Sequence, residues 1–180
     1  MTTQLSLADL IEEHRLAQAY STSLVEGLDA DQIAWRPNEN SSAIGWHLGH
    51  QGAVNHYMVR NLTAAEVTFD EAYDKVFDSA TPEPYRGELP SLDEIVAYRT
   101  AIATSTAGVI ARIGNGDVGA PAQLTRVAQR LMSSVIDHEY QHAKWIEEVR
   151  NSLIDTAAPT PASNRLVDVN GYWMIDSATL

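Results

Sequence analysis

Residues 121–151 read PAQLTRVAQRLMSSVIDHEYQHAKWIEEVRN, and this stretch decides the fold class. Its inward-facing residues recur at alternating spacings of three and four, which is the period of one face of an amphipathic helix. They are Leu124, Ala128, Leu131, Val135, His138, His142, Trp145 and Val149. Pro121 suits the first position of a helix, where its missing N–H is not needed. The sequence therefore predicts a long helix that turns one face into a helical core.

Three other stretches show the same period and are predicted as helices: 6–28, 42–61 and 91 to about 114. Ser6 can cap the first of them, and Ser41 or Ser42 can cap the second. Ser91 and Glu94 form a capping box at the start of the third. The inner face predicted for the second comprises Ala43, His47, His50, Val54 and Tyr57. Four amphipathic helices predict an all-α bundle.

The connections between these helices predict their order. The second and third helices are joined by the long segment 62–90, which is rich in helix breakers and in which we expect at most a short helical turn around 69–77. The short connections make the flanking pairs antiparallel, and the long crossover allows the second and third helices to be parallel, which gives an up-down-down-up bundle. We assign residues 1–158 to the bundle and residues 159–180 to an irregular, extended C-terminal tail packed on it.

The composition excludes several functional classes. The 180 residues suit one domain, and a formal net charge of −12 disfavours nucleic acid and anionic membrane surfaces as partners. The absence of cysteine excludes disulfides, thiolate ligands and a sulfur nucleophile borne by the protein. The sequence has no apolar run long enough to span a bilayer and no signal-peptide layout at its start. We therefore expect a cytoplasmic protein that acts on a small molecule.

Two histidines interrupt the apolar face of the last helix. His138 and His142 are four residues apart, so they lie one above the other and can share one metal ion. Burying two imidazoles without partners would be costly, and a metal removes that cost. An antiparallel second helix places His50 at the same height as His142, so His50 can be the third ligand. We predict one divalent metal on these three histidines, with an open position for water or substrate.

The metal and the remaining histidines are less closely defined. Three imidazoles favour zinc, with nickel, iron and cobalt as alternatives, and we expect no organic cofactor. His47 lies one turn before His50 and could be a base beside the metal, a fourth ligand or a surface histidine, the last being the interpretation we favour. We expect His56 at the surface and His14 as a hydrogen-bonded core histidine.

Residues 138–142 also spell H-E-x-x-H, the zinc-peptidase signature in which the glutamate activates water. The extended form of that signature needs glycine at position 145 and histidine at position 148, where this chain has Trp145 and Glu148. We therefore disfavour a peptidase. We expect Glu139 on the flank of the helix, with a hydrogen bond to a ligand histidine as the alternative.

Three sequence motifs resemble those of the DinB-like superfamily. They are Asp31-Gln-Ile-Ala-Trp-Arg-Pro37, Ser41-Ser-Ala-Ile-Gly-Trp-His-Leu-Gly-His50 and Asp137-His138-Glu-Tyr-Gln-His142. The resemblance covers roughly residues 5–150 and follows the element order of the family. It implies an up-down-down-up bundle, a mononuclear divalent metal on histidines that match His50, His138 and His142, and frequent dimers. Related domains include isomerases and S-transferases that use mycothiol, bacillithiol or glutathione, and metal domains of the iron enzymes of ergothioneine synthesis.

These observations favour a metal-dependent transferase or isomerase that uses a low-molecular-weight thiol as cosubstrate. A metal-dependent hydrolase of small molecules and a non-catalytic protein that binds a metal or small ligand are the alternatives. The candidate catalytic residues are Arg99, Tyr20, His47 and Glu139. Arg99 and Tyr20 are expected at the height of His50, where Tyr20 could contribute a hydroxyl. Arg99 could clamp a substrate carboxylate or extend to the surface, and both interpretations remain open.

The apolar residues outside the predicted core suggest an assembly. Trp145, Trp173 and the 62–90 segment offer more apolar surface than one small bundle obviously buries, so we expect a homodimer. The tail holds Tyr172, Trp173 and Met174, which should dock on an apolar surface. Two placements of the tail remain open: it lines or caps the substrate pocket, or it packs along the outer side of the bundle.

Overall fold

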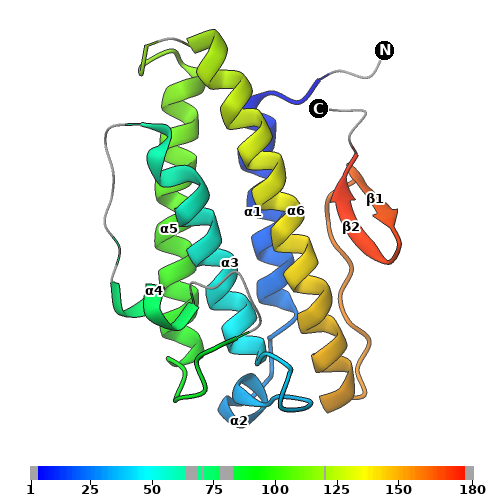
Figure 1. Cartoon of the computed structure of the whole chain (residues 1–180). Helices are drawn as coiled ribbons and strands as arrows, with labels where there is room; N and C mark the ends of the chain where they lie inside the picture. Colours follow the sequence, from blue (N-terminus) through cyan, green and yellow to red (C-terminus); the bar gives the residue numbers. More distant parts are fainter. Residues whose placement is uncertain (1–3, 64–68, 70, 78–82, 120, 177–180) are drawn as a thin grey trace.

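The computed structural model describes residues 4–63, 69, 71–77, 83–119 and 121–176. Four long helices form a bundle, and two short helices and a β-hairpin are added to it (Figure 1). The helices are α1 (Leu7–Ser23), α2 (Ala30–Ala34), α3 (Ile44–Val59), α4 (Glu71–Phe77), α5 (Leu92–Gly114) and α6 (Pro121–Leu153), with a 3-10 turn, Arg60–Leu62, after α3. The strands are β1 (Leu166–Val169) and β2 (Tyr172–Ile175).

The long helices α1, α3, α5 and α6 run up-down-down-up, as predicted (Figure 1). α3 ends and α5 begins at opposite ends of the bundle, so the two helices are parallel. α1 and α3 each pack against both α5 and α6, and α5 also contacts α6. The groove between α3 and α6 is where the histidines of the two helices meet.

Two of the predicted helix caps are confirmed, and one is wrong. Ser6 caps α1 with Asp9, and Ser91 caps α5 with Glu94, each in a complete capping box. The predicted serine cap of the helix over 42–61 is absent. α3 starts at Ile44, so its N-cap residue is Ala43, and the side chain of Ala43 makes no capping hydrogen bond.

Glu83 takes the place of that missing cap. Its carboxylate accepts the Ala43 N–H at 3.0 Å, while the Glu83 N–H donates to Ser42 Oγ at 3.1 Å. The Glu83 side chain is fully buried and pairs with Arg36. A carboxylate suits the positive end of a helix, and here it comes from the crossover, which the local sequence around Ser42 cannot reveal.

The first helix is shorter than the predicted 6–28 segment. α1 ends at Ser23, and Gly27 takes a φ of 81°, a left-handed conformation that glycine adopts without steric cost. Asp29 then caps α2 in a second capping box with Gln32. The helical spacing of apolar residues continues beyond Ser23 into the turn that follows α1. This spacing alone therefore predicted an end of the helix that lies too far along the chain.

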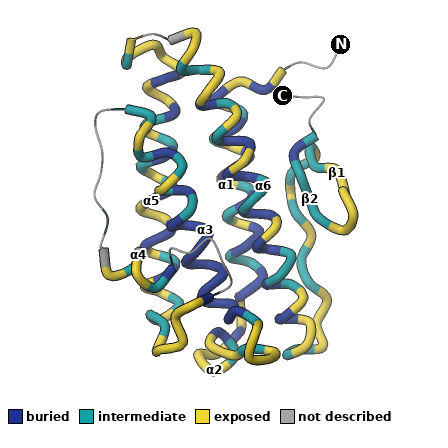
Figure 2. The backbone as a smooth tube through the Cα atoms, in the orientation of Figure 1, coloured by how far each residue is buried: buried dark blue, intermediate teal, exposed yellow. Residues whose placement is uncertain are grey.

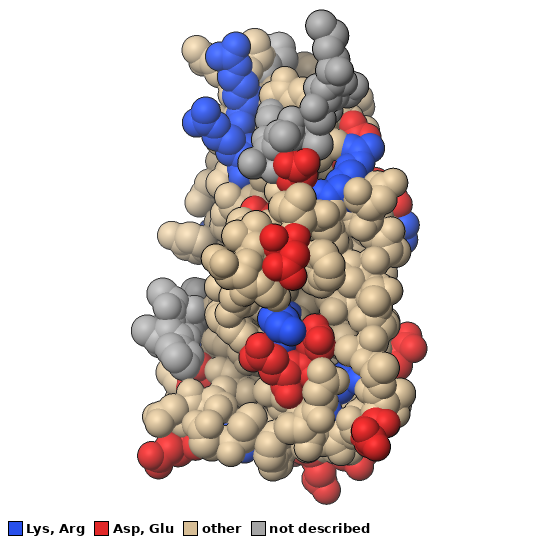
Figure 3. All heavy atoms as spheres, turned by 90° about the vertical axis from the view of Figure 1, so that its right-hand side faces the viewer, with Lys and Arg blue, Asp and Glu red and all other residues tan. Residues whose placement is uncertain are grey.

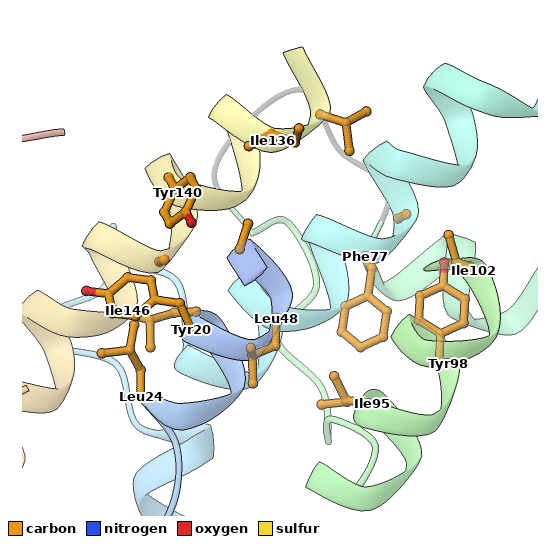
Figure 4. Close-up of a cluster of buried hydrophobic side chains, with 14 of the residues drawn as sticks. Tyr20, Leu24, Leu48, Phe77, Ile95, Tyr98, Ile102, Ile136, Tyr140 and Ile146 are labelled. Carbon is orange, nitrogen blue, oxygen red and sulfur yellow. The ribbon is translucent and has the colours of Figure 1, made fainter. Parts of the chain in front are cut away.

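The core extends along the bundle, and α3 lies deepest in it. Apolar side chains from all four long helices and from α4 pack together, among them Leu24, Leu48 and Phe77 (Figure 4). α3 is buried around its whole circumference from Ile44 to Ala53 (Figure 2). The single inner face predicted for this helix is therefore too narrow, and its last member, Tyr57, is 60% exposed. None of the described helices is long and apolar enough to cross a membrane.

The described part of the C-terminal tail, residues 159–176, packs on α1 and α6, and it contains a β-hairpin that the sequence analysis did not predict. β1 and β2 pair antiparallel, with Leu166 opposite Ile175. Asn170 and Gly171 form the turn with φ angles of 57° and 88°, as a two-residue hairpin turn requires. The Ile175 N–H donates to Asp137 Oδ1 at 2.9 Å, which ties the hairpin to α6. An Asn-Gly pair between apolar runs was the available signal.

Candidate metal centre

Three histidines meet in the groove between α3 and α6. His50 comes from the second turn of α3, and His138 and His142 come from successive turns of α6. One nitrogen of each ring lies within 4.8 Å of the others. The ring centroids are 4.4 Å apart for His138 and His142, and 4.7 Å apart for His50 and His142. Among the described residues this is the only group of metal-ligating type, and it contains the three residues that the sequence predicted.

The crossover helix α4 orients the His50 ring. The main-chain carbonyl of Phe77, at the end of α4, accepts a hydrogen bond from His50 Nδ1 at 2.7 Å. The preceding carbonyl, of Val76, accepts the Trp46 indole N–H at 3.0 Å. The last carbonyls of a helix have no partner within it, and α3 supplies donors to two of them. With a proton on Nδ1, the atom with which His50 can bind a metal is Nε2.

Gly49 allows α4 to approach α3 this closely. A Cβ atom added at Gly49 would lie 2.3 Å from the Phe77 ring, a distance that no packed side chain tolerates. The Phe77 ring is fully buried and cannot move aside freely. The glycine between His47 and His50 thus sets the distance between His50 and the carbonyl that orients it.

His47 is a buried neighbour of the group, so the surface position favoured for it is wrong. Its exposed fraction is 7%, and its Nδ1 lies 2.9 Å from His142 Nδ1. The prediction failed because α3 is covered on all sides at this level, with Trp145 5.6 Å from the His47 ring. A hydrogen bond between these Nδ1 atoms holds the His142 ring in place.

A cavity of about 720 Å³ opens above the histidines. The Trp46 ring stacks on His50 at 4.5 Å, and the Trp145 ring meets His142 edge-on at 4.7 Å, so two indoles wall the group. Residues of the 37–42 connection and of the last turns of α6 complete the lining. A volume of roughly 300–1,000 Å³ with mostly apolar walls and few polar groups is typical of a small-molecule site.

The three imidazoles fit a divalent metal. Burial, with His50 nearby, lowers the pKa of His138 to about 4, and burial together with His138, His47 and His50 lowers the pKa of His142 further. Neutral imidazole is the form that binds metals. Nitrogens that share a tetrahedral zinc lie about 3.3 Å apart, so small side-chain rotations would bring this group to ligand geometry.

Arg99 and Glu139 pair with each other and do not line the cavity. Their ion pair is buried, with side-chain exposures of 3% and 1%. Arg99 therefore neither clamps a substrate nor extends to the surface, so both expectations for it are wrong. Glu139 lies on the flank of α6, but it is buried there and pairs with Arg99, not with a ligand histidine. Each buried charge needs an opposite charge, and each of the two residues supplies it to the other. Glu139 follows His138 and so points about 100° away around the helix, which also disfavours a peptidase.

Tyr20 also lies away from the histidines. Its hydroxyl donates to Glu147 at 3.4 Å, and its side chain borders a different cavity, of about 380 Å³, that Trp173 also lines. Burial, followed by the charge of Glu147, raises the Tyr20 pKa, so the hydroxyl stays protonated. The expectation that Tyr20 contributes a hydroxyl to the metal site is therefore wrong, because the side chain turns toward Glu147 and a different cavity.

The two remaining candidates among the histidines are outside the group. His14 is 3% exposed and its Nε2 lies 3.3 Å from Asn55 Nδ2, which confirms it as a hydrogen-bonded core histidine. His56 is half-buried, with its ring 4.7 Å from Phe69, on a part of α3 beyond the site.

Sequence comparison agrees with this geometry. The chain matches the DinB superfamily over residues 13–146, which include all three histidines. The chain belongs to the DinB superfamily. DinB-like proteins bind metals, and the three-histidine group of this DinB protein could hold a metal ion. No curated protein matches the chain significantly. The β-hairpin lies outside the matched DinB region.

Proposed function

We propose that this DinB protein binds one zinc ion through His50, His138 and His142, and that it is a transferase or isomerase that uses an external low-molecular-weight thiol. The convergence of three neutral histidines below a mostly apolar cavity supports the proposal. A divalent metal on three imidazoles keeps a position open and lowers the pKa of a thiol or water bound there. Because the chain has no cysteine, the sulfur comes from a second small molecule.

The surrounding residues hold and shield the reacting groups. The Phe77 carbonyl fixes the His50 ring, and His47 fixes the His142 ring. The indole of Trp46 shields the His50 ring from water, and the indole of Trp145 shields the His142 ring. In the transferase reaction the thiol loses its proton and its sulfur bonds to an electrophilic carbon of the substrate. The leaving group departs with the electron pair of the broken bond. The cavity is large enough for both reactants.

The charge of the lining bears on which thiol binds. Among the described residues around the cavity there is no lysine or arginine, and Glu148 is an acidic member. Glutathione and bacillithiol carry carboxylates, which such a lining does not stabilise. Mycothiol carries no carboxylate. The lining therefore favours mycothiol among the three thiols.

A conjugation assay tests the proposal. Zinc-loaded protein is mixed with monochlorobimane and mycothiol, bacillithiol or glutathione, and the fluorescent S-conjugate is measured as chloride is released. We expect a rate above the uncatalysed reaction, highest with mycothiol and absent in His50→Ala. Equal rates with the protein and with His50→Ala would contradict the proposal.

Two other outcomes point to the alternative functions. Zinc-dependent hydrolysis of 4-nitrophenyl acetate without any thiol, and no conjugation with one, would indicate a hydrolase that uses the same three histidines. Tight zinc binding with neither reaction over a panel of electrophiles and esters would indicate a binding protein.

A further inference from the structure

A third cavity, of about 490 Å³, lies between the β-hairpin and α6. Its walls come from the middle of α6 and from the end of β1, the turn and β2 of the hairpin. His138 and Gln141 line this cavity and also the cavity above the histidines. The two cavities therefore border the same turn of α6, on either side of His138 and Gln141.

The hairpin presents an apolar face at this cavity. Val167 pairs with Met174 and Val169 pairs with Tyr172, and directly paired residues of antiparallel strands share a face. Val169, Tyr172 and Met174 line the cavity from this face, Trp173 lines it from the other face, and Val169 is 42% exposed. The opposite face carries Ile175, which is buried in the core. The hairpin thus uses one face for packing and leaves an apolar face beside the site.

Polar contacts hold the hairpin in this position. Asp137 accepts the Ile175 N–H, and Arg165, at the base of the hairpin, pairs with Asp9 at 3.2 Å and Glu13 at 3.4 Å on α1. The cavity is therefore preformed, and a ligand would bind to it without first ordering the hairpin.

The charge around the cavity favours an uncharged occupant. No lysine or arginine is among the described residues that line it, and Asp137 supplies a carboxylate. The face of the molecule that carries the hairpin is formed mostly by uncharged residues (Figure 3). An anionic group would find no cationic side chain among these described residues, whereas an apolar group would cover Val169, Tyr172 and Met174.

We infer that the hairpin and α6 form a second compartment of the substrate site, which binds an uncharged aromatic or aliphatic part of the substrate. This inference rests on the proposed function for the position of the reacting group. It makes substrate specificity a property of the hairpin, which lies outside the part of the chain that matches the DinB superfamily.

Hydroxamates with tails of increasing length test the inference on zinc-loaded protein. Acetohydroxamate anchors to the metal alone, and 4-phenylbutyrohydroxamate and 6-phenylhexanohydroxamate add a phenyl group with increasing reach. We expect the better phenyl compound to bind at least tenfold more tightly than acetohydroxamate. Val169→Ala and Tyr172→Ala should each reduce this gain threefold or more. Val167→Ala is the matched control, because Val167 lies on the same strand and face but does not line the cavity.

The inference is overturned if the phenyl group adds no affinity, or if the gain is the same in the wild type, Val169→Ala and Tyr172→Ala. A second measurement does not depend on the metal: metal-free protein is titrated with 2-phenylethanol, and the backbone amides of Val169 to Met174 are followed by NMR. Shifts there, with no hydroxamate binding to zinc-treated protein, would refute the proposed function and retain the compartment. Acetohydroxamate binding without any such shifts would retain the metal site and refute the compartment.

Discussion

Removal of one ligand histidine should abolish stoichiometric metal binding. We expect His50→Ala, His138→Ala and His142→Ala to purify with little zinc by elemental analysis, because two imidazoles hold the ion far more weakly than three. His47→Ala should weaken zinc binding about 10–100-fold, since it removes the contact that orients the His142 ring. His56→Ala should retain full zinc. A full complement in His50→Ala would transfer the ligand role to His47.

His14 should make the protein less stable in acid. Burial, followed by the charge of Arg99, lowers its pKa to about 4, whereas the unfolded chain binds the proton near pH 6.5. Its contribution to the free energy of unfolding is therefore complete above about pH 6.5 and is lost as the pH falls toward 4, and amounts to about 3 kcal/mol. Urea unfolding of metal-free protein from about pH 7 to pH 4 should show a smaller loss in His14→Gln than in the wild type. Equal losses would contradict this prediction.

At the scale of single residues, the sequence predicted the three histidines that meet between α3 and α6, but not the contacts of the residues around them. The spacing of His138 and His142, and the height of His50, follow from helix geometry alone. The ion pair of Arg99 and Glu139 joins two helices, and no local sequence pattern predicts it. His47 was misjudged for a similar reason, because its burial depends on side chains of other elements.

Among the elements, the approach of α4 to α3 should control metal affinity. A methyl group in Gly49→Ala would meet the Phe77 ring and push α4 away, so the Phe77 carbonyl would no longer hold His50. We expect zinc affinity, measured by calorimetry, to fall about 10–100-fold while helicity is retained.

Gly108→Ala is the matched control for this prediction. A Cβ atom at Gly108 has nothing within 4 Å, so this variant should bind zinc normally. It should gain roughly 0.5–1 kcal/mol in stability, because alanine favours a helix more than glycine does. Unchanged zinc affinity in folded Gly49→Ala would show that α4 does not position His50.

The elements were predictable where one helix face or one cap determines them. The four long helices and the caps at Ser6 and Ser91 follow from period and local side chains. The start of α3 does not, because its cap is Glu83 from a distant segment. The Asn170-Gly171 turn was a local signal, and reading it would have predicted the hairpin.

For the molecule as a whole, the buried pair of Arg99 and Glu139 should be a main determinant of stability. It connects α5 to α6 deep in the bundle. Glu139→Gln leaves the guanidinium without a countercharge and should cost about 3–5 kcal/mol in urea unfolding. The double variant Arg99→Met, Glu139→Leu should recover most of that loss, since no charge remains buried. A cost below about 1 kcal/mol for the single variant would contradict the role of the pair.

The homodimer also remains a prediction at this scale. Trp145 packs on His142, and Trp173 packs partly on the core, so two residues that suggested an interface have partners within the chain. Other apolar side chains are exposed, including Tyr57 at 60% and Val127 at 48%. We expect a dimer mass in light scattering at micromolar concentration, and a lower dimer fraction in Tyr57→Ser. A monomer mass for the wild type would reject the prediction.

The acceptor that orients His50 belongs to the main chain, and this affects how the protein can evolve. Substitution at position 77 changes a side chain but leaves the carbonyl in place. An insertion or deletion within α4 would place the carbonyl of a different residue, in a different orientation, beside the His50 ring. We therefore expect related chains to differ widely in the composition of the crossover, to keep the length of α4 up to this carbonyl, and to retain glycine at the position of Gly49. In related chains whose α4 has a different length, we expect the three histidines of the metal centre to be lost as well.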